Sequence, residues 1–393
     1  MDYIKIFLKD KKDKSLRRLH PWVFSGAIDR IDGTAYEGEI VEVYTKEKEY
    51  IATGIFHIGS IAIKIISFEQ IEINDDFWRN KIQKAILYRQ SLGFFDNSQT
   101  NIFRLIHGES DGLPGFIADY YNGVIVFQFH SLGLFHKKEL FTEIVRDLLQ
   151  DKVHCIYDKS LNSLPHKAEH PHKNSFLFGE TAEIVGTEYG HKFHIDLLEG
   201  QKTGFFIDQR ENRLLLQKYS KDKTVLNAFG YTGGFSVYAA GNGAKEVHTM
   251  DSSKRALEFA QKNIDLNFQN CNHQNICEDA FEFLSKIKGV YDLIVLDPPA
   301  FAKHLNVLKQ GLKGYRTINQ KAMAQIKPGG ILFTFSCSQV VSNEEFRTMI
   351  FSAANDAKRN VRIMHQLSQP VDHPVSVFHP ESEYLKGLVL HIE

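Results

Sequence analysis

The sequence predicts an α/β protein whose C-terminal half is a mostly parallel sheet, preceded by a small β-rich domain and an α+β domain. From about residue 225 onward, apolar strand-like runs alternate with helical patterns, which is typical of a parallel sheet covered by helices on both faces. The first 70 residues instead carry short strand-like runs without a helical period. The pattern changes near Asn74 and again after Glu188, so we expect three domains over residues 1–72, 73–188 and 189–393.

The composition is that of an ordinary globular protein. Of the 393 residues, 43% are hydrophobic and 24% are charged, and the formal net charge is −1, so any nucleic-acid surface has to be a local patch. The four cysteines form no C-x-x-C pair, which argues against zinc ribbons and thioredoxin-like motifs and fits a reducing compartment. No apolar stretch reaches about 18 residues and no signal peptide is visible, so we expect a soluble, cytoplasmic protein without a membrane partner.

The first domain is predicted to be a small β-barrel or sandwich. Apolar residues lie among charged ones in it, as in half-exposed antiparallel strands. The expected strands are Ile4–Leu8, Gly38–Tyr44, Ile51–Phe56 and Ile61–Ser67. A basic cluster after the first strand is either a nucleic-acid patch or a solvated loop. It consists of Lys9, Lys11, Lys12, Lys14, Arg17 and Arg18, with Asp10 and Asp13 interspersed.

The second domain is predicted to be α+β. Helical spacing of apolar residues predicts helices over Phe77–Gly93 and Lys137–Leu149. Strands are expected at Asn101–His107, Phe116–Tyr120 and Val124–Phe129, and the Asn-Gly pair before the last strand is a hairpin signal. A following loop carries His166, His170 and His172. A metal site there is the alternative to a plain loop, but no further ligand has a recognised spacing, so we expect no metal.

In the third domain, the elements follow from the alternation of apolar runs and helical patterns. The expected parallel strands are Thr224–Phe229, Glu246–Met250, His273–Cys277, Tyr291–Leu296 and Gly330–Phe335. The expected helices are Gly234–Ala240, Lys254–Asn267, Ala280–Ile287 and Arg316–Ile326. Two further strands, Val361–Gln366 and Tyr384–Ile392, are joined by a loop rich in proline and histidine. They could form an antiparallel hairpin that closes the edge of the sheet.

A glycine turn follows the first strand of this domain. In an open α/β sheet, ligands bind beyond the carboxyl ends of the strands, and glycines allow the backbone to approach them closely. The turn lacks the G-x-G-x-x-G spacing of dinucleotide-binding proteins, and a plain strand-to-helix connection is the alternative interpretation. The candidate cofactor-binding residues of the turn are Asn227, Phe229, Gly230, Tyr231, Thr232 and Gly233.

Two aspartates follow the next two strands. Asp251, with Ser252 beside it, stands roughly 20 residues beyond the turn, where a carboxylate can accept hydrogen bonds from two ribose hydroxyls. Asp279, with Ala280, could reach an adenine edge. The combination predicts an adenosyl ligand without a pyrophosphate, such as S-adenosylmethionine. The alternative is that each aspartate caps the helix that follows it.

An acidic prolyl motif, Asp297-Pro298-Pro299, ends the fourth strand. Prolines lack backbone donors, so the motif leaves carbonyls and a carboxylate as acceptors for a base that bears amino or imino groups. In amino-methylating enzymes an aromatic residue normally follows the two prolines. Here Ala300 follows and Phe301 comes one residue later, which weakens that interpretation.

Cys337, flanked by Ser336 and Ser338, ends the fifth strand. It is either an inert core residue or a thiolate nucleophile at the same edge as the cofactor turn. A nucleophile beside a methyl donor suits methylation of pyrimidine carbon 5. The thiolate adds to carbon 6, carbon 5 accepts the methyl group, and proton loss then expels the thiolate. Asp297 would stabilise the adduct through the ring N3 or the exocyclic amine.

Several of these segments resemble bacterial 23S ribosomal RNA methyltransferases of the cytosine-carbon-5 subgroup. The resemblance extends over essentially the whole chain. Gln201–Arg210 resembles the segment that precedes their catalytic domain, and the glycine turn resembles their cofactor motif. Leu296–Pro299 and Phe335–Ser338 resemble their motifs for base binding and nucleophilic attack. Arg18–Phe24 fits the start of their N-terminal PUA domain, and Arg104–Gly115 fits their central EEHEE domain.

The resemblance implies a fold, a cofactor and residue roles. The fold would be a PUA domain, an EEHEE domain and a Rossmann-like class I methyltransferase domain with a mostly parallel seven-stranded sheet. Lys202, Phe206, Asp208 and Gln209 would help to hold S-adenosylmethionine, and Asp297 would contact both cofactor and base. Cys337 would be the nucleophile, and Pro298 and Pro299 would contact the base. Ala300 departs from the long residue expected there, which affects substrate detail more than reaction type.

The leading hypothesis is therefore methylation of a cytosine carbon 5 in large-subunit ribosomal RNA. Lys11, Lys12, Arg17 and Arg18 would contact the RNA, and a homodimer is compatible with this hypothesis. A second hypothesis is methylation of a base nitrogen or guanine amino group, with Cys337 as a bystander. A third is an RNA-binding ribosome-assembly factor without catalysis, against which the intact Asp297, Cys337 and glycine turn argue.

Overall fold

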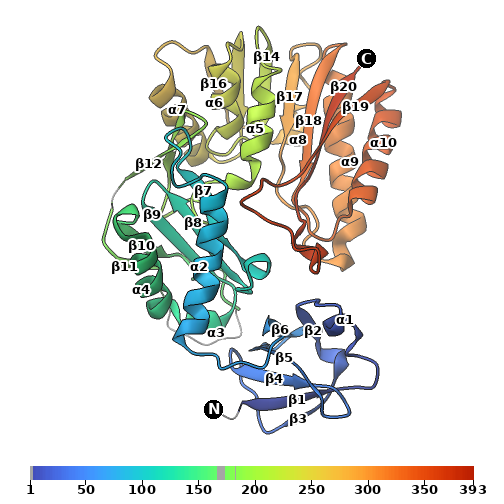
Figure 1. The fold of residues 1–393 in the computed structure, drawn as a ribbon. Coiled ribbons are helices and arrows are strands. Elements are labelled where there is room, and N and C mark those ends of the chain that lie inside the picture. Colours follow the sequence, from blue (N-terminus) through green and yellow to red (C-terminus); the bar gives the residue numbers. More distant parts are fainter. Residues whose placement is uncertain (1–2, 166–172, 182) are drawn as a thin grey trace. The chain divides into compact units, whose positions relative to one another are not determined.

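The chain forms two compact units in the computed structural model, which describes residues 3–165, 173–181 and 183–393 (Figure 1). The first unit comprises Met1–Ile184, Ile195–Phe205 and Asp372–Ser382. The second unit comprises Val185–His194, Phe206–Val371 and Glu383–Glu393. The chain thus passes between the units more than once. The predicted domain ends at residues 72 and 188 stay predictions.

A six-stranded sheet forms the N-terminal part of the first unit, as the sequence predicts. Its strand order is β2-β6-β5-β4-β1-β3, and only β1 and β4 pair in parallel. Alternate residues of the strands, such as Ile6, Val41 and Ile63, are buried in one core. The strands are β1 (Ile4–Leu8), β2 (Trp22–Phe24), β3 (Ile28–Asp32), β4 (Ile40–Tyr44), β5 (Tyr50–Phe56) and β6 (Ile61–Ser67).

The basic cluster of this domain is not simply a loop. Lys14–Arg17 form a one-turn helix, α1, which contributes the buried Leu16 to the core. The absence of a helical period was therefore a misleading signal, because one turn is too short to show a period of 3.6 residues. The short strands β2 and β3 were also missing from the prediction, since neither carries a long apolar run.

The middle part of the first unit is a five-stranded sheet with helices packed on it. Its strand order is β11-β10-β9-β8-β7. The Asn-Gly hairpin is confirmed, because Asn122 and Gly123 both have positive φ and connect two antiparallel strands. The elements are α2 (Asp75–Ser91), β7 (Ile102–His107), β8 (Phe116–Tyr121), β9 (Val124–Phe129), α3 (Leu132–Phe135), α4 (Lys138–Leu149), β10 (Cys155–Asp158) and β11 (Ser175–Phe178).

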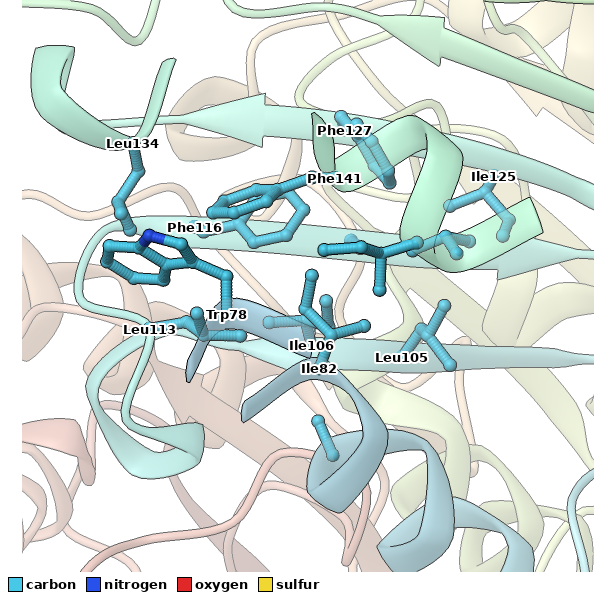
Figure 2. Close-up of a cluster of buried hydrophobic side chains, with 14 of the residues drawn as sticks. Trp78, Ile82, Leu105, Ile106, Leu113, Phe116, Ile125, Phe127, Leu134 and Phe141 are labelled. Carbon is cyan, nitrogen blue, oxygen red and sulfur yellow. The ribbon is translucent and has the colours of Figure 1, made fainter. Parts of the chain in front are cut away.

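Aromatic side chains dominate the core of this middle part. Figure 2 shows Trp78 and Ile82 from α2 against side chains of the sheet. The ring of Phe141 lies 5.6 Å from that of Trp78 and 5.3 Å from that of Phe116, measured between centroids. Such large, rigid side chains give this domain a core of its own.

The second unit contains a seven-stranded sheet that is mostly parallel. The strand order is β16-β15-β14-β17-β18-β20-β19, and only β20 runs antiparallel to its neighbours. The strands are β14 (Thr224–Ala228), β15 (Glu246–Met250), β16 (His273–Ile276), β17 (Leu293–Leu296), β18 (Gly330–Ser336), β19 (Val361–Leu367) and β20 (Lys386–Ile392). The helices are α5 (Arg210–Gln217), α6 (Gly234–Gly241), α7 (Lys254–Asn267), α8 (Ala280–Phe283), α9 (Leu308–Gln325) and α10 (Asn343–Ala357). A two-stranded ribbon, β12 (Ile184–Glu188) and β13 (His191–Ile195), precedes them.

The predicted hairpin is present, but β20 lies inside the sheet between β18 and β19. The inner strand, β20, is almost fully buried, whereas the edge strand, β19, is partly or fully exposed. Helix α10 was not predicted, although Ser342 and Glu345 form a capping box that marks its start. Among the described residues, no helix is long and apolar enough to cross a membrane.

Candidate cofactor site and nucleophile

Five parallel strands bring the predicted motifs to one edge of the sheet. The pairings β16–β15, β15–β14, β14–β17 and β17–β18 are all parallel. Their carboxyl ends therefore lie side by side, and each end is followed by a candidate residue. In the order of the sheet, these residues are Asp279, Asp251, Gly230, Asp297 and Cys337.

The glycine turn contains three residues in the left-handed region of backbone conformation. Phe229, Tyr231 and Gly233 have φ values of 58°, 44° and 79°. Residues other than glycine rarely adopt these positive values. A Cβ at Gly230 would lie 2.5 Å from Cγ2 of Thr249. A larger residue at Gly230 would therefore force the loop and the neighbouring strand apart.

The backbone amides of this turn are largely used within the protein. The amide of Gly230 donates to the Met250 carbonyl at 2.8 Å, and that of Gly233 donates to the Gly230 carbonyl at 2.8 Å. The amide of Tyr231 donates to Oδ2 of Asp251 at 3.0 Å. A pyrophosphate would need these donors and would meet the Asp251 carboxylate, so the turn fits a ligand without phosphates.

The two aspartates differ in the role they have locally. Asp251 does not cap α7, because Ser253 does so by accepting from the Ala256 amide at 3.2 Å. Its Oδ1 accepts from the Ser253 amide at 2.9 Å, which orients the carboxylate beside the turn. Asp279 is exposed and does cap α8, since it accepts from the Glu282 amide at 3.0 Å. The capping alternative thus holds for Asp279 and fails for Asp251.

A series of hydrogen-bonded side chains, which the sequence did not reveal, links the strand before the turn to the next two strands of the sheet, β15 and β16. Asn227 Nδ2 donates to Ser236 Oγ at 2.9 Å, and Ser236 lies 2.6 Å from Thr249 Oγ1. Thr249 Oγ1 in turn lies 2.7 Å from His273 Nε2. The buried Oδ1 of Asn227 has no hydrogen-bond partner among the described residues. An unsatisfied buried acceptor at the base of a ligand loop fits a site that is completed by a polar ligand.

Phe206, Asp208 and Gln209 belong to the second unit and lie before α5. The ring of Phe206 meets that of Tyr231 edge to face at 5.2 Å, so this residue does lie at the turn. Asp208 accepts from the Tyr384 hydroxyl at 2.7 Å, and Gln209 accepts from Asn212 at 2.6 Å. Lys202 is exposed and belongs to the first unit, so its role toward the cofactor stays a prediction.

A buried ion pair holds this segment in place, and sequence reasoning missed it. Arg213 donates from Nε and Nη2 to the two carboxylate oxygens of Glu188, each at 2.8 Å. Nη1 of the same guanidinium donates to the carbonyl of Phe206 at 2.9 Å. Tyr238 adds a third hydrogen bond to Glu188 at 3.0 Å. A buried bidentate pair that also bonds the Phe206 carbonyl is a rigid anchor for the Phe206 backbone.

Tyr315 of α9 joins the prolyl motif to the cysteine motif. Its hydroxyl lies 2.9 Å from Ser338 Oγ and accepts from the Phe301 amide at 3.3 Å. Burial raises the pKa of Tyr315, so the phenol stays protonated and can serve as a donor. The ring of Phe301 packs on that of Tyr315 at 4.6 Å, which shows that this aromatic residue helps to build the loop. Asp297 is partly buried, Pro298 is buried and Pro299 is exposed.

Cys337 is partly buried, and its thiol donates a weak hydrogen bond to the Pro298 carbonyl at 3.9 Å. Lys386 lies close to it, because its ammonium donates to the carbonyls of Ser338 at 2.6 Å and Tyr384 at 2.8 Å. Burial lowers the pKa of Lys386 to about 8, and the charge of Cys337 opposes this shift. Cys337 also packs against the hydrophobic cluster that contains Phe335 and Leu385, so its role as the nucleophile stays a prediction.

The basic cluster lies in the first unit and is only partly available. Arg17 pairs with Glu49 at 2.5 Å and with Asp13 at 2.6 Å, and these bonds raise its pKa. Lys9 donates to the Gly26 carbonyl at 3.0 Å. Lys11, Lys12 and Arg18 are exposed. The histidines at positions 166, 170 and 172 lie outside the described residues, and the described residues contain no group of side chains that could hold a metal ion.

Comparison with known proteins agrees with this geometry. Residues 104–377 match the profile of an S-adenosylmethionine-dependent methyltransferase family, and residues 6–68 match a PUA-like domain. The fold resembles that of a candidate methyltransferase from Streptococcus mutans, with a TM-score of 0.85 and 21% identity over 98% of this chain and 99% of that chain. It also resembles a candidate methyltransferase crystallised with SAH, with a TM-score of 0.86 and 22% identity over 98% and 99% of the two chains. The chain is therefore an S-adenosylmethionine-dependent methyltransferase with an N-terminal PUA domain.

Curated relatives define the family more narrowly. The ribosomal RNA large subunit methyltransferase I of Aliivibrio fischeri is 38% identical over 99% of this chain and 99% of its own length. The protein of the same name from Aeromonas salmonicida is 39% identical over 98% of each chain. This chain belongs to the ribosomal RNA large subunit methyltransferase I family.

Proposed function

We propose that this chain methylates carbon 5 of a cytosine in 23S ribosomal RNA, with Cys337 as a covalent nucleophile. The observation that carries the proposal is the polar setting of Cys337. Its thiol donates to the Pro298 carbonyl, and the Lys386 ammonium donates to the carbonyl of the next residue, Ser338. The names of the curated relatives support large-subunit ribosomal RNA as the substrate. The match to a PUA-like domain supports an RNA partner.

The proposed chemistry uses few groups of the protein. The Cys337 thiolate forms a bond to carbon 6 of the cytosine, and the electron pair of the ring double bond moves to carbon 5. Bound S-adenosylmethionine would supply an electrophilic methyl group, which carbon 5 accepts while the methyl–sulfur bond breaks and the neutral thioether S-adenosylhomocysteine leaves. Loss of the carbon-5 proton to water restores the ring double bond and expels the Cys337 thiolate. Asp297 accepts a hydrogen bond from the exocyclic amine and holds the base against the Pro298 and Pro299 edge.

The cofactor is proposed to lie along the glycine turn. Asp251 and Ser252 would bind the ribose, and Asp279 and Ala280 would border the adenine. Phe206, whose ring meets that of Tyr231, would contact the ligand beside the turn. The remaining proposed cofactor contacts are Lys202, Asp208, Gln209, Asn227, Phe229, Gly230, Tyr231, Thr232, Gly233 and Asp297, and the proposed RNA contacts are Lys11, Lys12, Arg17 and Arg18.

A covalent trap tests the nucleophile. Unmodified 23S ribosomal RNA that carries 5-fluorocytosine should form a stable adduct with the wild-type protein, because fluorine cannot leave carbon 5 as a proton does. Cys337→Ala should form no adduct and should methylate no normal RNA, while its affinity for S-adenosylmethionine stays close to that of the wild type. Cys271→Ala, which removes another partly buried cysteine, is the matched control and should behave as the wild type. Full methylation by Cys337→Ala would favour methylation of a base nitrogen instead.

The cellular setting follows from the substrate. We infer a cytoplasmic location, where ribosomal RNA is assembled into subunits. Mass mapping of nucleosides in ribosomal RNA from a deletion strain should show the loss of one 5-methylcytosine. A homodimer is a further prediction, which sedimentation of the purified protein would test.

A further inference from the structure

Lys386 is a buried lysine without a carboxylate partner. It begins β20, stands opposite Ser336 in the antiparallel pairing with β18, and has 2% of its surface exposed. Lysine is almost never buried to this extent unless its charge is paired. Its hydrogen bonds go to two carbonyls, and no carboxylate of the described residues forms an ion pair with it. The fold therefore keeps a positive charge in its interior at an energetic cost that packing alone does not explain.

The ionisable groups around this ammonium come from several elements. Burial lowers the pKa of Lys386, and the charge that opposes this most is that of Cys337, ahead of Glu383 beside β20 and Glu345 of α10. The phenol of Tyr315 on α9 also interacts with the charge of Cys337. Asp297 follows β17, the strand that pairs with β18. Of these groups, the cysteine thiolate is therefore the anion that couples most strongly to the lysine.

We propose that Lys386 is the positioning residue of Cys337, whose buried ammonium fixes the Ser336–Ser338 loop and stabilises the thiolate form of the cysteine. This inference rests on the proposed role of Cys337 as the nucleophile. The ammonium uses two of its three donors on the carbonyls of Ser338 and Tyr384. The bond to Ser338 ties the loop to β20, and the bond to Tyr384 holds the lysine against the chain just before the strand.

The positive charge of Lys386 is needed because the Pro298 carbonyl, which contacts the thiol, disfavours its ionisation. The Pro298 carbonyl presents a partial negative charge to the sulfur at 3.9 Å, so it favours the protonated thiol. A cation nearby shifts the equilibrium back toward the thiolate, and the thiol proton is released to solvent. Lysine also has to enter the loop from a neighbouring strand, and Gly387 permits this approach. A Cβ at Gly387 would lie 2.5 Å from the ring of Phe335.

The reactivity of the thiol tests the proposal without any methylation. The alkylation rate of Cys337 by iodoacetamide is measured against pH, with peptide mass spectrometry to separate the cysteines. In Lys386→Met the midpoint should rise by about one pH unit, which corresponds to a tenfold slower alkylation at neutral pH, because only the thiolate reacts. Lys386→Arg should keep a midpoint near that of the wild type, because it retains the charge. An unchanged midpoint in Lys386→Met, or an equal shift in Lys386→Arg, would overturn the proposal.

Two controls separate charge from general damage. Lys321→Met removes another lysine that is held by a backbone carbonyl, since Lys321 donates to Phe281 at 2.6 Å, and it should leave the Cys337 midpoint unchanged. The exposed Cys277 serves as the reference thiol within every sample. If Lys386→Met does not fold, Lys386→Gln takes its place, and an unchanged Cys337 midpoint in that variant would overturn the proposal.

The alkylation experiment tests the role of Lys386, whereas the 5-fluorocytosine adduct tests the proposed carbon-5 mechanism, so the two can fail separately. If 5-fluorocytosine RNA forms the adduct but Lys386→Met leaves the midpoint unchanged, the nucleophile is supported and the role of Lys386 is wrong. If the midpoint shifts but no adduct forms with the wild type, the lysine does tune the thiol and the carbon-5 mechanism is wrong. In the expected case both arms succeed, and the acid limb of the kcat profile moves to higher pH in Lys386→Met.

Discussion

At the scale of single residues, Asp251 explains why the glycine turn suits an adenosyl group rather than a dinucleotide. Its carboxylate accepts from the amides of Tyr231 at 3.0 Å and Ser253 at 2.9 Å. One interaction closes the turn, and the other orients the start of α7. Each oxygen keeps a further lone pair for a ribose hydroxyl, whereas a pyrophosphate would be repelled by the charge.

Asp251→Ala should weaken the binding of S-adenosylmethionine by about 1–3 kcal/mol, because the variant lacks the charged carboxylate that would accept hydrogen bonds from the ribose hydroxyls. Calorimetry with the purified protein measures this change. The wild type should bind S-adenosylmethionine and not NAD. Asp279→Ala is the comparison, and it should have the smaller effect because its carboxylate is exposed and already caps α8. Tight binding of NAD, with no heat from S-adenosylmethionine, would contradict this assignment.

His273, at the end of the series of hydrogen-bonded side chains that starts at Asn227, is a second informative residue. Its Nδ1 lies 3.1 Å from Oε1 of Gln261, and its Nε2 lies 2.7 Å from Thr249. A proton on Nδ1 lets Nε2 accept from Thr249, so that every bond from Asn227 onward has one donor and one acceptor. Burial, with a smaller contribution from His248, lowers the pKa of His273 to about 4.

This lowered pKa predicts a loss of stability in acid. The unfolded chain takes up the proton near its ordinary pKa of about 6.5, whereas the folded protein resists it until about pH 4. The free energy of unfolding should therefore fall between these two pH values, by about 1–3 kcal/mol from this group. His273→Gln should flatten this slope in unfolding experiments across the range. His304→Gln, which changes an exposed histidine, should not, and equal slopes in all three proteins would refute the assignment.

At the scale of elements, helix α9 and the loop after Pro299 are built around two glycines. A Cβ at Gly311 would lie 2.6 Å from Cβ of Ala302 and 3.0 Å from its backbone nitrogen. A Cβ at Gly314 would meet only the ring of Phe301, at 3.1 Å. The sequence predicted that this helix begins at Arg316, but α9 begins at Leu308. The first turns were missed because glycines weaken a helical pattern in the sequence. The close approach of the loop to the helix is what requires them.

Gly311→Ala should destabilise the protein by about 1–3 kcal/mol through overpacking, even though alanine favours a helix by about 1 kcal/mol. It should also reduce methylation, because the displaced loop follows Asp297-Pro298-Pro299. Gly314→Ala is the matched variant. Its effect should be smaller, since an aromatic ring can shift more easily than a backbone. Thermal unfolding of both variants measures the difference, and a stabilised Gly311→Ala would show that the loop is not closely packed.

At the scale of the whole molecule, the C-terminal part of the chain contributes to both units. The segment Asp372–Ser382 belongs to the first unit, although β19 and β20 on either side of it belong to the second. The buried Asp372 accepts from the Arg104 amide at 2.8 Å, and its carbonyl accepts from Arg89 at 2.8 Å. Tyr384 and Lys386 follow this segment directly, so the chain returns to the second unit beside the Ser336–Ser338 loop.

RNA binding by the first unit should depend on the exposed lysines of the basic cluster. Replacing Lys11 and Lys12 with glutamine should weaken RNA binding and should reduce the slope of log affinity against log salt by roughly one for each phosphate that is no longer bound. Arg17→Gln should change the slope less, because Glu49 and Asp13 already neutralise this guanidinium. Filter binding over a range of salt concentrations tests both. An unchanged slope in the lysine variants would place the RNA surface elsewhere.

The sequence by itself determined the fold class, the cofactor class and the edge of the sheet that the predicted motifs share. Alternating apolar runs and helical patterns specify parallel strands, and motifs at successive strand ends must share an edge. The glycine turn, Asp251 and the prolyl and cysteine motifs follow directly from this rule. The capping of α8 by Asp279 was foreseen as an alternative, and it was correct because the rule for helix starts is equally local.

Only the tertiary structure decided which distant groups act on these motifs. Lys386 reaches the Cys337 loop because β20 inserts between β18 and β19, and no local pattern encodes that order. The hydrogen bonds between Arg213 and Glu188 and between Tyr315 and Ser338 likewise join residues that no local pattern connects. The structure also shows that Asp13 and Glu49 pair with Arg17, which the sequence had placed among the free basic residues. Local rules act over a few residues, whereas strand register and side-chain packing join residues that are far apart in the chain, and these interactions set the charge and rigidity of the site.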